Sequence, residues 1–215
     1  MAFKAVIFDK DGVIIDTKPI HFHVLSLFLS EIGLSLTESE YNNYCGITSI
    51  ELFKRINEKF NKNYDIDRMV EKFQRIYIDT IRECRDIKPI NNVDSLIKKL
   101  YEKEIRLAVA SSAKREKIEL VLSRFKLTNY FKAIVSGYEV TNSKPHPDIF
   151  LEAAKKLKVN PSECIVIEDS TNGVRAAKSA NMFCVGYNNP ISNQDLSEAD
   201  IVINDFNDFN LEDIQ

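Results

Sequence analysis

Apolar and polar residues follow two different patterns along the chain. The first strong signal is Ala5-Val6-Ile7-Phe8, a run of four apolar residues that predicts a buried strand. From about residue 21 to residue 84, apolar residues recur at helical spacing in three blocks, which cover residues 21–32, begin again at 48, and run from 67 to 84. This section contains no convincing strand. The pattern therefore predicts one strand followed by an all-helical segment.

After residue 87 the pattern becomes an alternation of helices and strands. Helices are predicted at residues 93–104, 114–125, 148–157 and 172–179, and strands at 107–110, 133–135, 165–167, 184–186 and 201–203. Such alternation indicates βαβ units and a parallel sheet with helices on both faces. We therefore expect the α/β fold class, with a doubly wound sheet formed by residues 1–16 and 87–215. An all-helical cap of residues 17–86, inserted after the first strand, would act as a hinged lid.

Composition excludes several classes of protein. The 215 residues carry a net charge of −3, so no basic excess argues for binding to nucleic acid or to an acidic membrane surface. No apolar run approaches the roughly 20 residues of a membrane span. The N-terminal residues lead directly into a strand and the four cysteines are scattered, which indicates core thiols in a reducing cytoplasm. We expect a monomer or a small homo-oligomer.

Two acidic residues, Asp9 and Asp11, directly follow the first predicted strand, with Gly12 behind them. Asp and Gly are depleted in strands and common in turns, so the strand is expected to end here. Two carboxylates this close repel each other and need a cation, a shared proton or another partner. Taken alone, the pair is as consistent with a solvated acidic turn as with a functional site.

Further polar residues follow the later strands. Ser111 and Ser112 come after the second strand, Lys144 lies on the loop after the third, and Glu168 and Asp169 follow the fourth. Each has an ordinary explanation when seen alone, such as a helix cap or a solvated loop lysine. In an open parallel sheet, however, the ligand crevice lies at the carboxyl ends of the strands. Four successive strand ends with such residues therefore favour a functional site.

The residue types indicate phosphate chemistry. Asp9, Glu168 and Asp169 offer the hard oxygen ligands that Mg²⁺ prefers. Lys144, Ser111 and Ser112 suit the oxygens of a phosphate group. With its charge offset, Asp9 would act as a nucleophile that forms an aspartyl-phosphate, and Asp11 would serve as general acid and base.

These motifs resemble those of the haloacid dehalogenase-like hydrolase superfamily. The first is Asp9-Lys10-Asp11-Gly12-Val13, the second ends in Ser111, the third contains Lys144 in Ser143-Lys144-Pro145, and the fourth is Glu168-Asp169-Ser170. The resemblance covers nearly the whole chain. It implies a Rossmann-like core with a helical cap after the first strand. It also implies Asp9 as nucleophile, Asp11 as acid/base, and Mg²⁺ held by Asp9, the Asp11 backbone carbonyl and Asp169, with or without Glu168.

Within the superfamily the chain is most similar to the branch of β-phosphoglucomutases and small sugar-phosphate phosphatases. His21 matches a cap histidine that contacts the acid/base in the mutases, and Cys45-Gly46-Ile47-Thr48 resembles the substrate-specificity loop. Ser49 stands where the mutases carry an arginine for the second phosphate, and the cap lysine is absent, with Arg75 close to its place. These residues are the cap candidates for substrate binding. Lys10 is a further departure, since an apolar residue commonly lies between the two aspartates.

The leading hypothesis is a Mg²⁺-dependent phosphatase of a small phosphorylated metabolite, a sugar or polyol phosphate. The alternative is a phosphomutase of the β-phosphoglucomutase type, which the loss of the cap arginine disfavours. A third hypothesis, from another class, is a phospho-accepting signalling domain, which also groups acids, a hydroxyl residue and a lysine at strand ends. Chain length and the helical cap argue against it.

Overall fold

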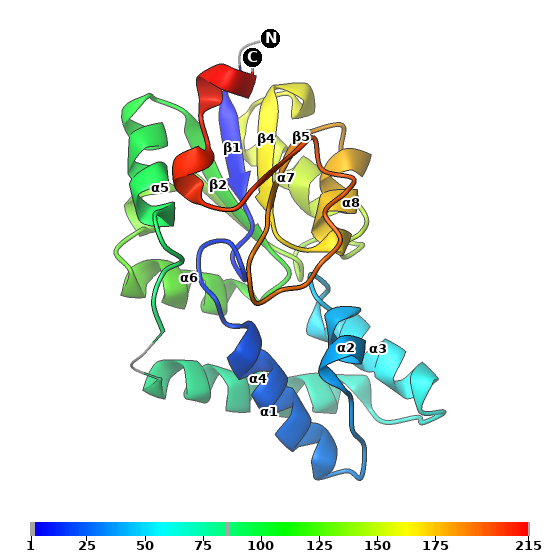
Figure 1. Ribbon diagram of the computed structural model, residues 1–215. Helices are drawn as coiled ribbons and strands as arrows, with labels where there is room; N and C mark the ends of the chain where they lie inside the picture. Colours follow the sequence, from blue (N-terminus) through cyan, green and yellow to red (C-terminus); the bar gives the residue numbers. More distant parts are fainter. Residues whose placement is uncertain (1–2, 85–86, 215) are drawn as a thin grey trace.

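Six parallel strands form the central sheet of the computed structural model, which describes residues 3–84 and 87–214 (Figure 1). The strands are β1 (Ala5–Phe8), β2 (Arg106–Ser111), β3 (Ala133–Ser136), β4 (Cys164–Glu168), β5 (Phe183–Tyr187) and β6 (Ile201–Ile203). Their spatial order is β3-β2-β1-β4-β5-β6. The order reverses direction at β1, so the crevice of this doubly wound sheet lies at the carboxyl end of β1. The predicted fold class is confirmed.

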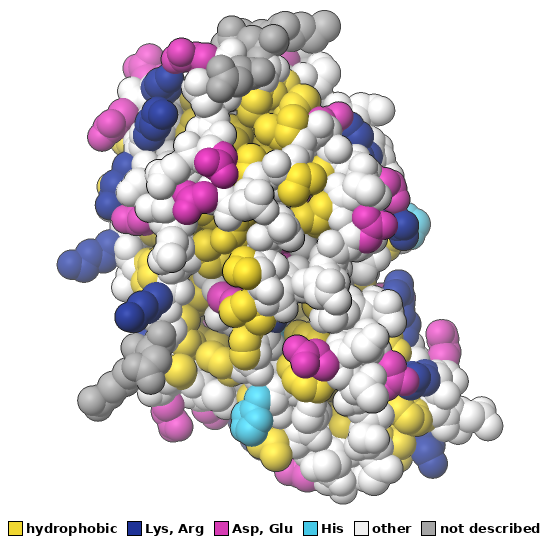
Figure 2. Space-filling model, viewed as in Figure 1, with side chains coloured by type: hydrophobic (Ala, Val, Ile, Leu, Met, Phe, Trp, Pro, Cys, Tyr) yellow, Lys and Arg dark blue, Asp and Glu magenta, His cyan; other side chains and the backbone are white. Residues whose placement is uncertain are grey.

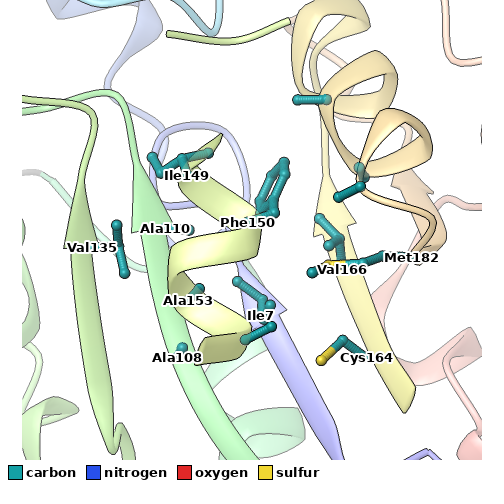
Figure 3. Packing of buried hydrophobic residues seen from close by; sticks show 14 of the residues in the cluster. Ile7, Ala108, Ala110, Val135, Ile149, Phe150, Ala153, Cys164, Val166 and Met182 are labelled. Atoms are coloured by element: carbon teal, nitrogen blue, oxygen red, sulfur yellow. The ribbon is translucent and has the colours of Figure 1, made fainter. Parts of the chain in front are cut away.

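Alternating side chains of the strands pack under helices on the two faces of the sheet. Ile7 belongs to the hydrophobic cluster beneath α7 (Asp148–Leu157) and α8 (Thr171–Ser179), whereas Phe8 belongs to the cluster beneath α5 (Val93–Glu102) and α6 (Arg115–Arg124). Figure 3 shows Phe150 and Ala153 of α7 packed over the strands. Both faces are covered because the strands are apolar on both sides, as is usual for parallel sheets.

The regular elements described between β1 and β2 are all helices. It contains α1 (Lys18–Ser30), α2 (Glu38–Asn42), α3 (Ser49–Lys59) and α4 (Ile66–Glu83), which we call the cap helices. They have their own hydrophobic cluster, centred on Phe28, Phe53 and Phe73, whose ring centroids lie 5.5–6.0 Å apart. In Figure 1 these helices lie across the carboxyl end of the sheet. They therefore cover the crevice.

The two chain segments that join the cap helices to the sheet run side by side. Ile15 forms an antiparallel bridge with Pro89, and the Ile90 N–H donates to the Ile14 carbonyl at 3.0 Å. The expected boundary at Asp86, together with Arg85, lies outside the described residues. The two segments therefore lie side by side, and their action as a hinge stays a prediction.

Helix and strand positions agree with the sequence pattern, apart from short elements. The first cap helix begins at Lys18 and ends at Ser30 instead of covering residues 21–32. The five-residue α2 was not predicted; it is set by Thr37 and Glu40, which form a capping box. Four 3₁₀ turns also lay outside the prediction, at Thr128–Tyr130, Pro161–Glu163, Phe206–Asp208 and Leu211–Ile214. Such short elements contain too few residues to show a period.

The interior contains buried thiols, and the surface carries charges of both signs (Figure 2). Cys164 and Cys184 are completely buried thiols of the sheet clusters, as predicted. Among the described residues, no helix is both long and apolar enough to cross a membrane. On the face shown in Figure 2, acidic and basic side chains are interspersed rather than gathered by sign, in keeping with the small net charge.

Candidate active site

The loop after β1 holds both aspartates of the first motif in a tight turn. The Asp9 N–H continues the sheet by donating to the Ile167 carbonyl at 3.0 Å, and the Gly12 N–H donates to the Ile15 carbonyl at 2.7 Å. Gly12 has φ +86°, and a Cβ there would lie 2.1 Å from Asp169 Oδ2. Glycine is therefore required here both for the backbone conformation and for the close approach of Asp169.

Asp9 lies at the floor of the site beside a buried lysine. Lys144 Nζ donates to Asp9 Oδ1 and to Glu168 Oε1, each at 2.6 Å. Burial raises the pKa of Asp9 to about 8, although the Lys144 charge works against this rise. Burial would also lower the pKa of Lys144, but the charges of Asp9 and Glu168 outweigh it and raise that pKa above its usual value. Lys144 is therefore a charged partner for the nucleophile candidate.

Glu168 uses both carboxylate oxygens inside the loop that follows β4. Its Oε1 accepts from Lys144, and its Oε2 accepts from the Asp169 and Ser170 N–H groups, each at 2.8 Å, and from Ser170 Oγ at 2.9 Å. The side chain also packs against Gly173, where a Cβ would lie 1.8 Å from Oε1. Glu168 thus positions Lys144 and the N-terminal turn of α8. Its direct role as a metal ligand stays a prediction.

Asp169 is paired with a cation from the cap helices. Lys18, in the first turn of α1, donates to Asp169 Oδ2. Burial raises the pKa of Asp169 to about 6, with the Lys18 charge working in the opposite direction. This ion pair links the cap helices to the loop after β4.

Asp11 faces a different set of partners. Its Oδ1 accepts hydrogen bonds from Lys10 Nζ and from Thr17 Oγ1. Burial alone would raise the pKa of Asp11, but the charge and hydrogen bond of Lys10, together with Thr17, hold it below its usual value. Asp11 is therefore ionised, the form that can take a proton from water. Lys10, which departs from the family pattern, has a defined place in the site.

A cavity of about 80 Å³ lies between the sheet and the cap helices. Seven of the predicted site residues line it: Asp9, Asp11, His21, Ser49, Ser111, Ser112 and Asp169. Lys144 and Glu168 lie behind its floor and are almost completely buried. The structure therefore brings together residues from both segments of the sheet and from the cap helices.

Arg75 is the predicted site residue that the structure does not bring to the cavity. It is exposed on α4, whereas Gln74 and Tyr77 of the same helix line the cavity. Residues three apart share a helix face, and Arg75 is rotated away from Gln74 by about 100°. The place beside the missing cap lysine is thus held by the Gln74 amide, which donates to Ser49 Oγ.

His21 contributes an uncharged ring to the cavity. Its Nδ1 is 2.9 Å from the Tyr41 hydroxyl, and its ring packs edge-on against Phe73 and Tyr77 at centroid distances of 5.1 Å. Burial, followed by the charge of Lys117, lowers the pKa of His21 to about 3. The imidazole is therefore neutral at physiological pH. Its predicted contact with Asp11 stays a prediction.

The specificity loop expected from the resemblance is attached to the sheet by hydrogen bonds. Ser112 Oγ donates to the Gly46 carbonyl at 2.6 Å, and Asn172 Nδ2 donates to the Cys45 carbonyl at 2.8 Å. Gly46 has φ +81°, and a Cβ there would lie 2.5 Å from Ser170 Oγ. The loop therefore closes one side of the cavity at close range.

The cavity residues that sequence reasoning missed include Lys18, Gln74 and Lys117. Lys18 lies three residues before His21, and this helical spacing is a signal that would have found it. Gln74 and Tyr77 are related by the same spacing. Lys117 offers no comparable signal, because it is one of four charged residues in a row at the start of a helix.

The cavity contains donors suited to a divalent cation. Among residues 3–84 and 87–214, no three His, Cys, Asp or Glu side chains are grouped closely enough to form a ready metal site. Even so, burial raises the pKa of both Asp9 and Asp169, and the Lys18 ammonium already binds Asp169 as a cation would. Carboxylate oxygens in need of positive charge fit Mg²⁺. The residues present therefore fit the metal that the resemblance implies.

Parallel strands thus deliver an acidic pair, a serine, a lysine and a second acidic pair to one covered crevice, the place where enzymes with an open α/β sheet bind their ligands. Residues 6–187 match the family model of the haloacid dehalogenase-like hydrolases. The chain belongs to this enzyme family. Within it, the chain is similar to sugar-phosphate phosphatases and phosphomutases.

Three known proteins illustrate this similarity. The chain is 32% identical to the β-phosphoglucomutase of Bacillus subtilis over 215 residues, 97% of this chain and 92% of that one. It is 33% identical to the phosphorylated carbohydrates phosphatase of Thermotoga maritima over 184 residues, 83% of this chain and 82% of that one. The crystal structure of β-phosphoglucomutase from Clostridium difficile has a TM-score of 0.88 at 34% identity, covering 99% of this chain and 96% of that one.

Two relatives from Arabidopsis thaliana are longer proteins. The chain spans 20% of one of them and 54% of the other. The similarity to these two therefore concerns one segment of each.

Proposed function

We propose that the chain is a Mg²⁺-dependent phosphatase of a small phosphorylated metabolite, a sugar or polyol phosphate, that acts through an aspartyl-phosphate on Asp9. The observation that carries this proposal is the position of Asp9 at the floor of a covered cavity, where its Oδ1 lies 2.6 Å from Lys144 Nζ. Asp11, two residues further along the chain, lines the same cavity. The sheet of residues 1–16 and 87–215 supplies these groups. The cap of residues 17–86 covers them.

Each residue has a defined part in the proposed reaction. Ser111, Ser112 and Lys144 bind the phosphate oxygens, and an Asp9 oxygen attacks phosphorus as the bond to the leaving oxygen breaks. Asp11, once it has taken up a proton, gives that proton to the leaving oxygen, and the carboxylate so regenerated takes one from the water that hydrolyses the aspartyl-phosphate. Asp9, the Asp11 backbone carbonyl and Asp169, with or without Glu168, would hold Mg²⁺, which would supply positive charge that offsets the phosphate oxygens.

Replacing the nucleophile tests this proposal. Asp9→Asn is expected to lower phosphate release from 4-nitrophenyl phosphate to below about a hundredth of wild type, because an amide oxygen cannot form the phosphoenzyme. The fold is expected to survive, since burial already disfavours the charged form of Asp9. Steady-state kinetics and circular dichroism measure the two effects. The control is Asp94→Asn, which removes a carboxylate on the surface of α5.

The outcome that would refute the nucleophile assignment is a folded Asp9→Asn variant with a tenth or more of the wild-type activity. A folded wild-type chain that hydrolyses no phosphate ester would refute the phosphatase proposal as a whole.

A phosphomutase of the β-phosphoglucomutase type is the second candidate. It is favoured by the two relatives named β-phosphoglucomutase, at 32% and 34% identity. Against it, the cavity contains Ser49, and no arginine lines it among the described residues. Incubation with β-glucose 1-phosphate and its bisphosphate cofactor distinguishes the two: isomerisation without net phosphate release would replace the phosphatase proposal. Membership of an enzyme family leaves the signalling-domain hypothesis without support.

The proposal extends to the cellular compartment and the oligomeric state. A reducing cytoplasm is supported by the four cysteines, all of which are free thiols. A monomer or a small homo-oligomer is checked by light scattering of the purified chain.

A further inference from the structure

Lys117 is a buried lysine without an acidic partner in the described part of the chain. It lies in the first turn of α6, is 5% exposed and lines the cavity. No hydrogen bond or ion pair joins its side chain to another described residue. Its Nζ instead lies 3.8 Å from the centroid of the Tyr77 ring. In Figure 1, α6 lies beside α4, the cap helix that carries Tyr77.

The other lysines of the site behave differently. Lys10, Lys18 and Lys144 each contact a carboxylate within the site. The pKa of Lys117 lies well below its usual value. Burial is the largest cause, and the positive charges of Lys10 and Lys114 lower it further. Asp11 and Glu116 oppose this lowering only in part. A buried ammonium is stabilised when an anion enters its surroundings.

A second polar group of the same cavity also lacks a partner. Gln74 Oε1 is buried and accepts no hydrogen bond from any described residue. Gln74 Nε2 is already used by Ser49 Oγ and by the Tyr138 hydroxyl, the latter at 3.3 Å. A buried amide oxygen without a donor costs free energy, on the order of 1–3 kcal/mol. Both unpartnered groups line the space between the sheet and the cap helices.

We propose that Lys117 binds a second anionic group carried by the leaving-group part of the substrate, and that Gln74 Oε1 accepts a hydrogen bond from a hydroxyl of that same part. This inference rests on the proposed phosphatase function and narrows its substrate class. The class is a hydroxylated phosphate ester with a carboxylate or a second phosphate. A neutral polyol phosphate leaves Lys117 without an anion.

The position of Lys117 determines where this second charge lies. Asp11, which serves the leaving oxygen, and His21 are both within its electrostatic reach. In the proposed reaction the phosphate lies at Asp9 and Ser111, on the floor of the cavity, with Lys144 behind Asp9. The second anion is therefore expected beside the Lys117 ammonium, on the side of Nζ that faces away from the Tyr77 ring.

Matched substrate pairs test the proposal. Glycerol 3-phosphate and 3-phosphoglycerate differ by a hydroxymethyl group and a carboxylate, and glucose 6-phosphate and glucose 1,6-bisphosphate differ by a second phosphate. We expect wild type to favour the anionic member of at least one pair about tenfold in kcat/KM, since one charge-assisted contact contributes 1.4 kcal/mol or more. Lys117→Met is expected to remove that preference, mainly through KM.

Two control variants separate charge recognition from a structural role. Lys117→Arg keeps the positive charge and is expected to retain part of the preference. Lys126→Met removes an exposed lysine just after α6 and is expected to leave the preference unchanged. If Lys117→Met loses the preference for the anionic member only in the carboxylate pair, the second anion is a carboxylate. If it loses the preference only in the bisphosphate pair, the second anion is a phosphate.

The proposal is overturned if wild type shows no preference, or if Lys117→Met lowers kcat/KM for both members of each pair by the same factor. Binding to the Asp9→Asn chain, measured by calorimetry, repeats the comparison without turnover. If no ester is hydrolysed but this chain still binds the anionic members more tightly through Lys117, the phosphatase proposal fails and the anion site stands. If wild type shows no preference in kcat/KM and the Asp9→Asn chain shows none in binding, the anion site itself is refuted.

Discussion

The pKa values of the acidic residues in the site depend on which lysines contact each of them. Asp9, Asp11, Glu168 and Asp169 are all buried or partly buried, and lysines 10, 18 and 144 each contact one or two of them. The effect differs from acid to acid: the pKa of Asp11 is lowered, whereas burial outweighs the lysines at Asp9 and Asp169. Acids with opposite shifts in neighbouring positions suit different roles in one reaction.

His21 makes the stability of the chain depend on pH. Its pKa is about 3 in the folded chain and 6.5 when unperturbed, so between these values the unfolded chain binds more protons. The stabilisation from the neutral ring is therefore present above pH 6.5 and is lost as pH falls. We expect wild type to lose about 2 kcal/mol more unfolding free energy than His21→Leu between pH 7 and pH 5, because each pH unit below the unperturbed pKa contributes about 1.4 kcal/mol. Urea unfolding at both pH values measures this difference.

His23 provides the control for this prediction. It lies on the same helix but is exposed. His23→Leu is therefore expected to show the pH dependence of wild type. An unchanged pH dependence in His21→Leu would contradict the buried, neutral state of that ring.

At the scale of elements, glycine decides how closely the cap approaches the sheet. Gly46→Ala places a Cβ against Ser170, the N-cap of α8, so we expect the loop to be pushed away from the cavity and KM to rise about tenfold. Gly33→Ala is the matched control, because Gly33 also has positive φ, +70°, but no atom within 4 Å of its Cβ position. Both variants are expected to lose about 1 kcal/mol of stability to backbone strain.

Kinetics together with chemical denaturation distinguish these effects. A rise in KM of the same size in both variants would show that backbone strain, and not contact with Ser170, is responsible.

The elements themselves followed from local patterns. The helix at residues 148–157 has the predicted bounds, and Pro19 lies in the first turn of α1 as expected. The ends of β2 at Ser111 and of β4 at Glu168 also follow the pattern, because each apolar run stops at a polar residue. The start of α3 also agrees, since the block predicted from residue 48 begins at its N-cap Thr48. The α2 helix was missed, because its capping box at Thr37 depends on side-chain hydrogen bonds that a periodic pattern does not contain.

At the scale of the whole molecule, the acidic residues of the cavity make catalysis depend on a divalent cation. EDTA is expected to stop phosphate release and Mg²⁺ to restore it, because the lysines alone do not hold Asp9 and Asp169 in their charged forms. Mg²⁺ is also expected to raise the melting temperature of wild type, since it binds the folded chain. Asp169→Asn is expected to lose most of this rise. Full activity after exhaustive removal of metal would contradict the prediction.

The site was predictable where it depends on topology and unpredictable where it depends on the cap. Asp9, Asp11, Ser111 and Asp169 follow strands, and any parallel sheet gathers the ends of its strands at one edge. Arg75 was misplaced because its burial depends on the rotation of α4 against the sheet, which brings Gln74 to the cavity instead. Sequence order contains no information on that rotation.

By itself, the sequence determined the alternation of strands and helices, the helical insertion after the first strand, and the polar residues at four strand ends. These features are local, because hydrophobic period and turn-forming residues act over a few neighbours. Only the tertiary structure decided which charges meet: Lys18 on Asp169, Lys144 between Asp9 and Glu168, and Lys117 without an acid. The reason is physical. Pairing and burial of a charge depend on segments far apart in the chain, and only the packed molecule brings those segments together.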